Sequence, residues 1–125
     1  MLKLKQDNSE LVVLSVLAEG ASYGYAISKA SEARSEGHFK LTASGMYPLL
    51  TKLEKSGLVT TDWEEVKAAG ADPDSTGRRR KWYTLSAKGH KQLVRRIEMH
   101  RQMQSILDGF VLPASGTDTQ SGLVG

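Results

Sequence analysis

The sequence predicts a mainly α-helical fold with a small β-hairpin: three helices, two strands and one further helix. Two observations predict it. Apolar residues recur at helical spacing in four stretches of the chain. Between the third and fourth stretches, two segments rich in β-formers flank a run of turn residues, 67–77. A chain of 125 residues fits one domain with one core, extended by an appended helix.

The first two helices are predicted in the N-terminal third of the chain. Asp7, Asn8 and Ser9 offer capping side chains before the apolar segment 11–17, which Gly20 ends. Ser22 is predicted to cap a second helix that closes at Gly37. Residues 38–41 are predicted to form an extended link, with a brief strand as an option.

The third helix is predicted to begin after Thr42 and to end at Gly57. Its apolar face consists of Met46, Leu49, Leu50 and Leu53. The opposite face is hydroxyl-rich and basic, a chemistry that suits groove edges and phosphates, and consists of Ser44, Tyr47, Thr51, Lys52 and Lys55. Pro48 removes an internal hydrogen bond, so propensity alone predicts a kink there. The alternative interpretation is an ordinary amphipathic helix with a solvated outer face.

The two β segments, 58–66 and 79–85, are predicted to form a hairpin whose tip is 67–77. Four consecutive cations, Arg78, Arg79, Arg80 and Lys81, are predicted to lie at the tip, where folding does not bury them. Because adjacent cations repel, we expect this cluster to contribute nothing to stability and to contact phosphates or a minor groove instead. A solubilising charge run is the alternative.

The last helix is predicted to begin after Ser86 and to run to about Asp108, with Pro113 as its stop. Its apolar stripe consists of Leu93, Ile97, His100, Met103, Ile106, Leu107 and Phe110. This stripe is too wide for so short a chain to cover, so we expect the copy in a partner subunit to cover it. The predicted organisation is a DNA-binding domain over 1–85, a dimerisation helix over 86–112 and a flexible tail over 113–125.

Charge and composition narrow the class of partner. The formal net charge is only +3, but residues 78–101 contain nine Lys or Arg against the single acid Glu98, which indicates an anionic partner. The chain has no cysteine, no apolar run long enough for a membrane span and no signal-peptide core in residues 1–10. We therefore expect a soluble, cytoplasmic protein that does not bind membranes.

Catalysis is not expected. The three histidines, His38, His90 and His100, fall on three different predicted elements and have no metal-ligand spacing. There is no glycine-rich phosphate loop, and no serine lies in a nucleophile-elbow context. The sequence therefore predicts no enzyme, no metal site and no cofactor.

Three helices followed by a hairpin is the winged helix-turn-helix arrangement, in which the third helix enters the major groove and the hairpin lies against the neighbouring backbone. The motifs in this chain resemble those of the PadR family of bacterial transcriptional regulators. They are Tyr-Gly-Tyr-Ala-Ile at 23–27, Ser-Gly-Met-Tyr-Pro-Leu-Leu at 44–50, Leu-Glu-Lys-Ser-Gly-Leu-Val at 53–59 and the Gly-Arg-Arg-Arg-Lys-Trp-Tyr run that opens 77–89. The resemblance is collinear from about residue 11 to residue 107, and it makes Pro48 an expected feature.

The resemblance implies a homodimer that binds a pseudo-palindromic operator in double-stranded DNA, usually to repress a nearby gene. It carries Tyr23, Ser44, Tyr47 and Lys52 over as DNA contacts, with Arg78 and Arg79 in the wing. Thr51 and Arg80 join them from the exposed helix face and the basic run. The last helix resembles the family's dimerisation arm, which assigns Leu93, Ile97, His100, Met103 and Leu107 to the dimer contact.

Some of the family's smaller members carry a tryptophan in this helix that stacks flat ligands at the dimer centre. Here His100 stands near that place in the absence of the tryptophan, so the resemblance does not carry the stacking site over to this chain, and the identity of any small-molecule effector is undefined. His100 either titrates near neutral pH and couples charge to dimer geometry, or is a hydrogen-bonded interface residue. The alternative function is a winged-helix protein–protein interaction module, which would lack salt-sensitive, sequence-specific DNA binding.

Overall fold

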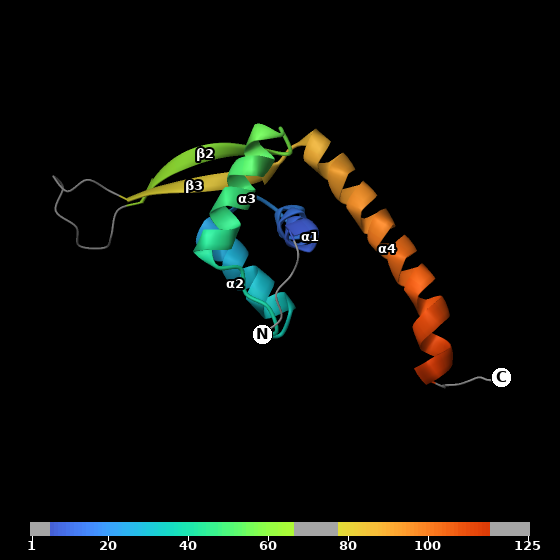
Figure 1. The fold of residues 1–125 in the computed structure, drawn as a ribbon. Helices are drawn as coiled ribbons and strands as arrows, with labels where there is room; N and C mark the ends of the chain where they lie inside the picture. The colour runs from blue at the N-terminus through green and yellow to red at the C-terminus, as the bar shows by residue number, and fades with distance from the viewer. Residues whose placement is uncertain (1–5, 67–77, 116–125) are drawn as a thin grey trace. The chain divides into compact units, whose positions relative to one another are not determined.

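The computed structural model describes residues 6–66 and 78–115, and the chain divides into two compact units, residues 1–93 and 94–125. The fold is mostly helical with a small antiparallel sheet, which confirms the predicted fold class (Figure 1). The elements in chain order are α1 (Gln6–Leu17), β1 (Ser22–Tyr23), α2 (Gly24–Arg34), α3 (Ala43–Lys55), β2 (Val59–Val66), β3 (Arg78–Leu85) and α4 (Ala87–Ser115).

The core of the first unit lies between the first three helices and the sheet. Its fully buried side chains come from all three helices and include Val13, Leu14, Ile27, Leu50 and Leu53. On α3 the buried residues are the four that the helical spacing predicts. Burying a leucine removes apolar surface from water and stabilises the fold by roughly 1.5–3 kcal/mol, so the apolar face of α3 fixes which of its sides remains exposed.

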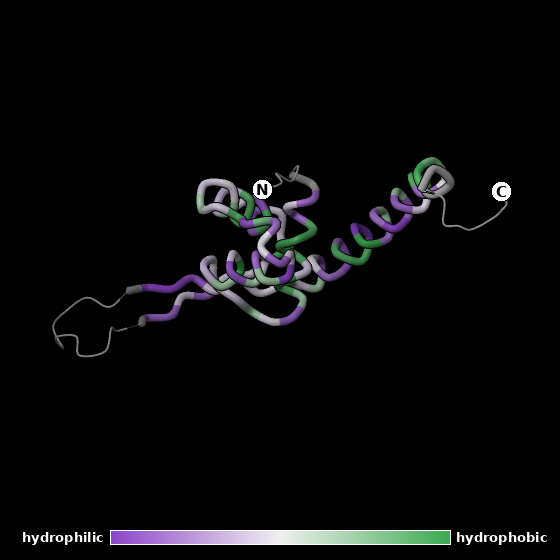
Figure 2. The backbone as a smooth tube through the Cα atoms, turned by 90° about the horizontal axis from the view of Figure 1, so that it is seen from below, coloured by the Kyte–Doolittle hydropathy of each residue, from purple (hydrophilic) through white to green (hydrophobic). Residues whose placement is uncertain are grey.

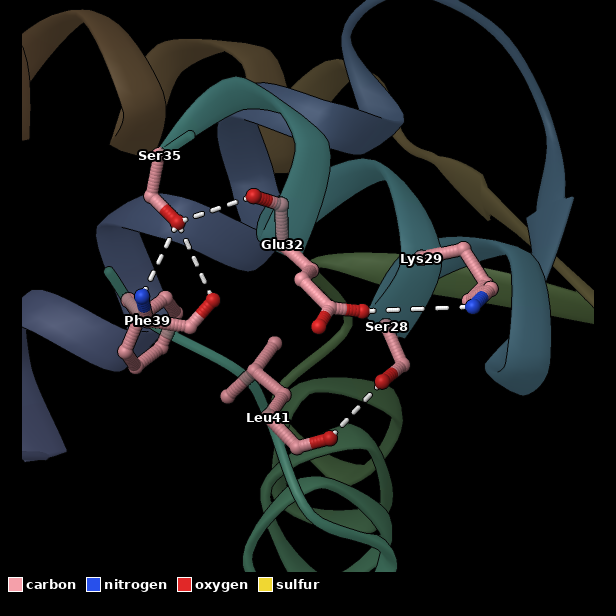
Figure 3. Close-up of polar contacts among 6 residues, drawn as sticks. All are labelled: Ser28, Lys29, Glu32, Ser35, Phe39 and Leu41. Carbon is pink, nitrogen blue, oxygen red and sulfur yellow. Dashed lines mark hydrogen bonds and ion pairs between the residues drawn. The ribbon is translucent and has the colours of Figure 1, made fainter. Parts of the chain in front are cut away.

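The connection between α2 and α3 is held by side-chain hydrogen bonds to the backbone (Figure 3). The Ser28 hydroxyl donates to the Leu41 carbonyl at 2.8 Å. The Ser35 hydroxyl lies 3.1 Å from the Glu32 carbonyl and 3.0 Å from the Phe39 carbonyl, and accepts from the Phe39 N–H at 3.0 Å. The brief strand considered for 38–41 does not form. The Phe39 N–H and the Phe39 and Leu41 carbonyls bond to these serines instead of to a neighbouring strand.

The sheet has three strands in the order β1-β3-β2, all antiparallel. The hairpin of β2 and β3 agrees with the prediction, and the residues predicted for its tip, 67–77, lie outside the described residues. β1 is an addition: Ser22 pairs with Tyr83, and Tyr23 pairs with Trp82. Ser22 was predicted to cap α2, but Tyr23 occupies that position in extended conformation without a side-chain cap bond.

The first turn of α4 is anchored to the end of α3. Ser86 precedes α4 and accepts the Gly89 N–H at 3.0 Å, which confirms its capping role. Its hydroxyl also donates to the Gly57 carbonyl at 2.6 Å. Gly57 adopts φ +76°, the left-handed conformation predicted after α3.

α4 is longer than predicted, because it ends at Ser115 instead of near Asp108. Pro113 therefore lies inside its final turn and does not stop it. A proline removes a single backbone donor, a small loss so near a helix end. Figure 2 shows hydrophobic residues recurring between hydrophilic ones along this helix. Residues 116–125 of the predicted tail lie outside the described residues.

Candidate nucleic-acid interface

The exposed face of α3 carries the side chains that the sequence predicted for it. Ser44, Tyr47, Thr51, Lys52 and Lys55 are all exposed, while Met46 and the three leucines point into the core. With about 100° of rotation per residue, Ser44, Thr51 and Lys55 lie at the centre of the exposed face. This face therefore presents two hydroxyls and an ammonium group in a row along the helix.

The N-terminal half of α3 has two unusual features. Thr42 is the N-cap, as predicted, but it makes no side-chain cap bond, and its hydroxyl lies 3.3 Å from the Ser44 hydroxyl. Pro48 sits within the helix without interrupting it. Because proline has no N–H, the Ser44 carbonyl lacks its usual helical donor. Both residues are exposed, so this acceptor is on the side open to a ligand.

Tyr47 is positioned by a glycine on the neighbouring helix. A Cβ added to Gly24, the first residue of α2, would overlap the Tyr47 hydroxyl and come within 2.8 Å of Cζ of its ring. The ring therefore packs directly on the backbone of α2, although Tyr47 remains 46 % exposed. Only glycine at position 24 allows this packing, which fixes where the Tyr47 hydroxyl lies.

A carboxylate joins α3 to the hairpin. Glu54, in the last turn of α3, accepts hydrogen bonds from the Lys81 ammonium at 3.1 Å and from the Thr61 hydroxyl at 2.9 Å. The bond from Lys81, followed by the one from Thr61, holds the pKa of Glu54 below its usual value. Tyr83, which lies opposite Thr61 in the strand register, is buried, and burial raises its pKa. The hairpin is thus bonded to α3 through both of its strands.

The register gives the hairpin two different faces. Residues directly opposite one another share a face, so Lys81 and Trp63 lie on the same side as the Glu54 contact from α3. The Arg79 guanidinium carbon lies 4.4 Å from the centroid of the Trp63 ring, and the Lys81 ammonium lies 5.6 Å from it. We call this side, with Trp63, Arg79 and Lys81, the α3 face of the hairpin.

The other side of the hairpin, the β1 face, carries Tyr23, Glu64, Arg80 and Trp82. Tyr23 and Trp82 pack edge to face with centroids 5.1 Å apart. The Arg80 guanidinium carbon lies 4.1 Å from the Tyr23 ring centroid, and its Nη1 is 3.9 Å from the Glu64 carboxylate. Glu64 also accepts the Trp82 indole N–H at 2.8 Å. These four side chains therefore satisfy one another.

The four cations of the basic run thus differ in position from the prediction. They lie along β3 and not at the hairpin tip. Arg80 and Lys81 are half-buried and pair with Glu64 and Glu54, whereas the prediction placed all four cations where folding does not bury them. Folding brings these acids from β2 and α3 to positions that the order of residues along the chain does not reveal. Arg78 opens β3 opposite Val66, and its side chain is outside the described part of the structure.

The second unit contains most of the predicted dimer contact. On α4, His100, Met103 and Leu107 are exposed, and Ile97 is half-buried. Leu93 differs, because it is 7 % exposed and belongs to the core of the first unit. Further apolar side chains are exposed on the same helix: Val94, Met99, Ile106, Phe110 and Val111.

A cavity of about 260 Å³ lies beside α1 and α2, with Leu11, Val12 and Phe39 among its apolar lining residues. Three of its polar lining groups already have partners in the chain. Ser31 donates to the Ile27 carbonyl, Ser35 bonds to Phe39, and Arg34 lies 3.2 Å from Glu19. The cavity therefore gives no ground for naming an effector.

Residues 6–66 and 78–115 contain neither a candidate membrane span nor a candidate metal site. Within those ranges no helix is long and apolar enough to cross a bilayer. In the same part of the chain, no three histidine or acidic side chains gather as ligands for a metal ion.

Comparison with known proteins places the chain among transcriptional regulators. Its structure is similar to that of a transcriptional regulator from Clostridium thermocellum, with a TM-score of 0.71 and 24 % identity over 85 % of this chain and 95 % of that one. A Streptococcus mutans protein gives a TM-score of 0.70 and 28 % identity over 95 % and 97 % of the two chains. A PadR family transcription regulator from Clostridium difficile gives 0.62 and 25 % over 82 % and 96 %.

The sequence itself supports the same assignment. Residues 13–95 match the profile of the Transcriptional regulator PadR-like family. The matched range includes α2, α3 and the hairpin, which are the elements that build the interface described above. The chain therefore belongs to the PadR family of transcriptional regulators.

Proposed function

We propose that this chain acts as a homodimeric repressor that binds a pseudo-palindromic operator in double-stranded DNA. In this arrangement α3 enters the major groove and the hairpin lies against the neighbouring backbone as the wing. The observation that carries the proposal is the exposed face of α3, where hydroxyl and ammonium groups lie together beside a hairpin bearing Arg79. Membership of a family of DNA-binding regulators supports it.

The roles proposed for the α3 residues follow from their chemistry. Ser44, in the first turn, is suited to a base edge or a phosphate, because backbone N–H groups at a helix N-terminus also attract anions. The Tyr47 hydroxyl, held by packing on Gly24, is suited to a phosphate. The Thr51 hydroxyl can donate or accept a hydrogen bond in the groove, and the Lys52 ammonium is a point charge suited to the phosphate backbone of the DNA.

Dimerisation is proposed through α4. Met103 and Leu107 are exposed apolar residues on the same face one turn apart, and Ile97 and His100 continue this face. Exposing such residues to water is unfavourable, and a second copy of α4 would cover them. A twofold dimer would present two α3 helices to half-sites about one helical turn apart, which accounts for a pseudo-palindromic operator.

The proposal is tested by selecting binding sites from a pool of random duplexes and measuring affinity by fluorescence anisotropy. Selected duplexes should contain two inverted half-sites. Log affinity should fall steeply against log salt, by about 0.9 for each phosphate contact. Weak binding without salt dependence or sequence preference would instead indicate a protein–protein interaction module.

Repression is tested separately from binding. The selected operator is placed across a promoter that drives a reporter gene, and the chain is expressed in the same cells. Reporter output should fall when the wild-type chain is present, and a scrambled operator of the same composition should abolish the effect. Increased output would show an activator and contradict the repressor assignment.

A further inference from the structure

The two faces of the hairpin differ in how their arginines are satisfied, although these residues are neighbours in sequence and equal in charge. On the β1 face, Arg80 lies over Tyr23 and pairs with Glu64. On the α3 face, Arg79 lies over Trp63, and among the described residues it forms no ion pair. Arg80 therefore has a carboxylate partner on its own face, whereas Arg79, although it lies opposite Glu65 in the strand register, forms no ion pair in the described part of the chain.

Trp63 has no evident structural task in the part of the chain that the structure describes. It is 54 % exposed on a strand, whereas an indole usually stabilises a fold by burial. Two cations, Arg79 and Lys81, lie over its ring. Lys81 in turn is bonded to Glu54 on α3. A continuous row of contacts thus runs from α3 to Arg79 along one face of the hairpin.

Stacking on an indole changes what a guanidinium group can do. The planar group retains its N–H donors at its edge while its face is covered, so it can still bind a phosphate through two parallel hydrogen bonds. The ring also restricts a side chain that otherwise has many rotamers, which lowers the entropy lost on binding. A tryptophan under an arginine therefore favours phosphate binding without contacting the phosphate.

We propose that Trp63 is a positioning residue for DNA binding: its ring holds Arg79 on the α3 face of the hairpin, so that Arg79 and α3 contact one duplex together. Arg80, on the opposite face, contributes less. This inference rests on the proposed DNA-binding function. It adds that the wing contacts DNA mainly through its α3 face, and that Trp63, which the sequence-based prediction does not include, sets the strength of the contact between Arg79 and the phosphate.

The experiment measures the affinity of the full chain for a fluorescein-labelled duplex of about 30 mixed base pairs over a salt series, because phosphate contacts do not depend on sequence. Arg79→Ala should weaken binding and reduce the salt slope by about 0.9. Trp63→Ala should weaken it about two- to fivefold, the size of an exposed cation–π contact, with the slope unchanged. Trp63→Phe, which keeps an aromatic face, should restore most of the affinity.

Three comparisons decide whether Trp63 acts through Arg79. In the Arg79→Ala background, Trp63→Ala should have no further effect. Arg80→Ala removes the same charge from the β1 face and should weaken binding less than Arg79→Ala. Tyr25→Ala removes an aromatic side chain that is 65 % exposed on α2 and should leave affinity unchanged. Far-ultraviolet circular dichroism checks that each variant is folded.

The outcomes separate this inference from the proposed function. If the wild-type chain binds duplex DNA but Trp63→Ala binds equally well, the inference is wrong and the proposed function stands. Equal losses from Trp63→Ala in the wild-type and Arg79→Ala backgrounds would also overturn it, because Trp63 would then act independently of Arg79. A wild-type chain that binds no duplex at any salt concentration would overturn both.

Discussion

The Glu54 carboxylate in the last turn of α3 lies 3.1 Å from the Lys81 ammonium in β3, and this bond joins the helix to the hairpin. Both groups are partly exposed, with side-chain exposures of 37 % and 29 %. An exposed ion pair contributes little by itself. Thr61 adds a second hydrogen bond to the same carboxylate, so the contact is a small network whose main effect is to fix the geometry between α3 and the wing.

The first prediction concerns the pH dependence of this network. Because the pKa of Glu54 is lowered in the folded chain, its contribution to stability is present above the unfolded-state pKa of about 4.3 and is lost as the pH falls through the folded-state value. Glu54→Gln should therefore be less stable than wild type at neutral pH, and the difference should vanish in acid. Urea denaturation at several pH values measures it.

Glu36→Gln is the matched control for this series, because Glu36 is an exposed carboxylate in the turn after α2. Its stability should follow that of wild type at each pH. If Glu54→Gln and Glu36→Gln behaved alike, the Lys81 and Thr61 bonds would have no energetic weight.

The second prediction concerns the contact between Gly24 and Tyr47. Gly24→Ala should destabilise the chain by about 1–3 kcal/mol through overpacking and should weaken DNA binding, because the new methyl group displaces Tyr47. In a Tyr47→Ala background the same change should be neutral or stabilising. Thermal denaturation of the four variants measures the coupling.

Gly45→Ala provides the control within α3. A Cβ there meets only the Thr42 hydroxyl oxygen, at an ordinary 3.5 Å, so alanine should stabilise the helix by about 0.5–1 kcal/mol. Equal destabilisation at positions 24 and 45 would contradict a specific clash with Tyr47.

The third prediction concerns the exposed face of α3. Lys52→Ala should weaken binding to all duplexes and lower the salt slope by about 0.9. Ser44→Ala should instead reduce the preference for the selected operator over mixed-sequence DNA, and Tyr47→Phe should behave like Lys52→Ala in affinity but leave the slope nearly unchanged. Anisotropy titrations with both duplexes measure these effects, and an unaltered operator preference in Ser44→Ala would exclude it from base recognition.

The fourth prediction concerns α4. Ile97→Glu and Met103→Glu should each yield monomers and abolish operator binding, because a charge would be buried at the proposed dimer contact. Gln102→Glu adds the same charge at an exposed polar position beside Met103 and should remain dimeric. Sedimentation velocity gives the oligomeric state, and a monomeric variant with full operator affinity would refute the role of this helix.

The sequence predicted the helices and strands that are specified by short-range patterns of residues. The buried face of α3 follows from the spacing of Met46, Leu49, Leu50 and Leu53, and Gly57 marks its end through its left-handed conformation. The hairpin follows from two β-rich segments around a turn. Pro48 was expected only through family resemblance, since propensity favours a break there.

Features that depend on distant pairing were missed. β1 has only two residues, and its partner strand begins more than fifty residues later, so no local pattern in Ser22 and Tyr23 identifies it. The acids that pair with Arg80 and Lys81 come from other elements. The role inferred for Trp63 has the same origin, because its place opposite Lys81 depends on the register between two strands.

Tyr23 ends β1 and Gly24 begins α2, with no residue between strand and helix. An inserted residue would either shift the register of β1 by one residue, so that its side chains move to the opposite faces of the sheet, or rotate the buried face of α2 by about 100°. Chain length at this junction is consequently as restricted as residue identity. Insertions and deletions among relatives should therefore accumulate elsewhere and spare this point.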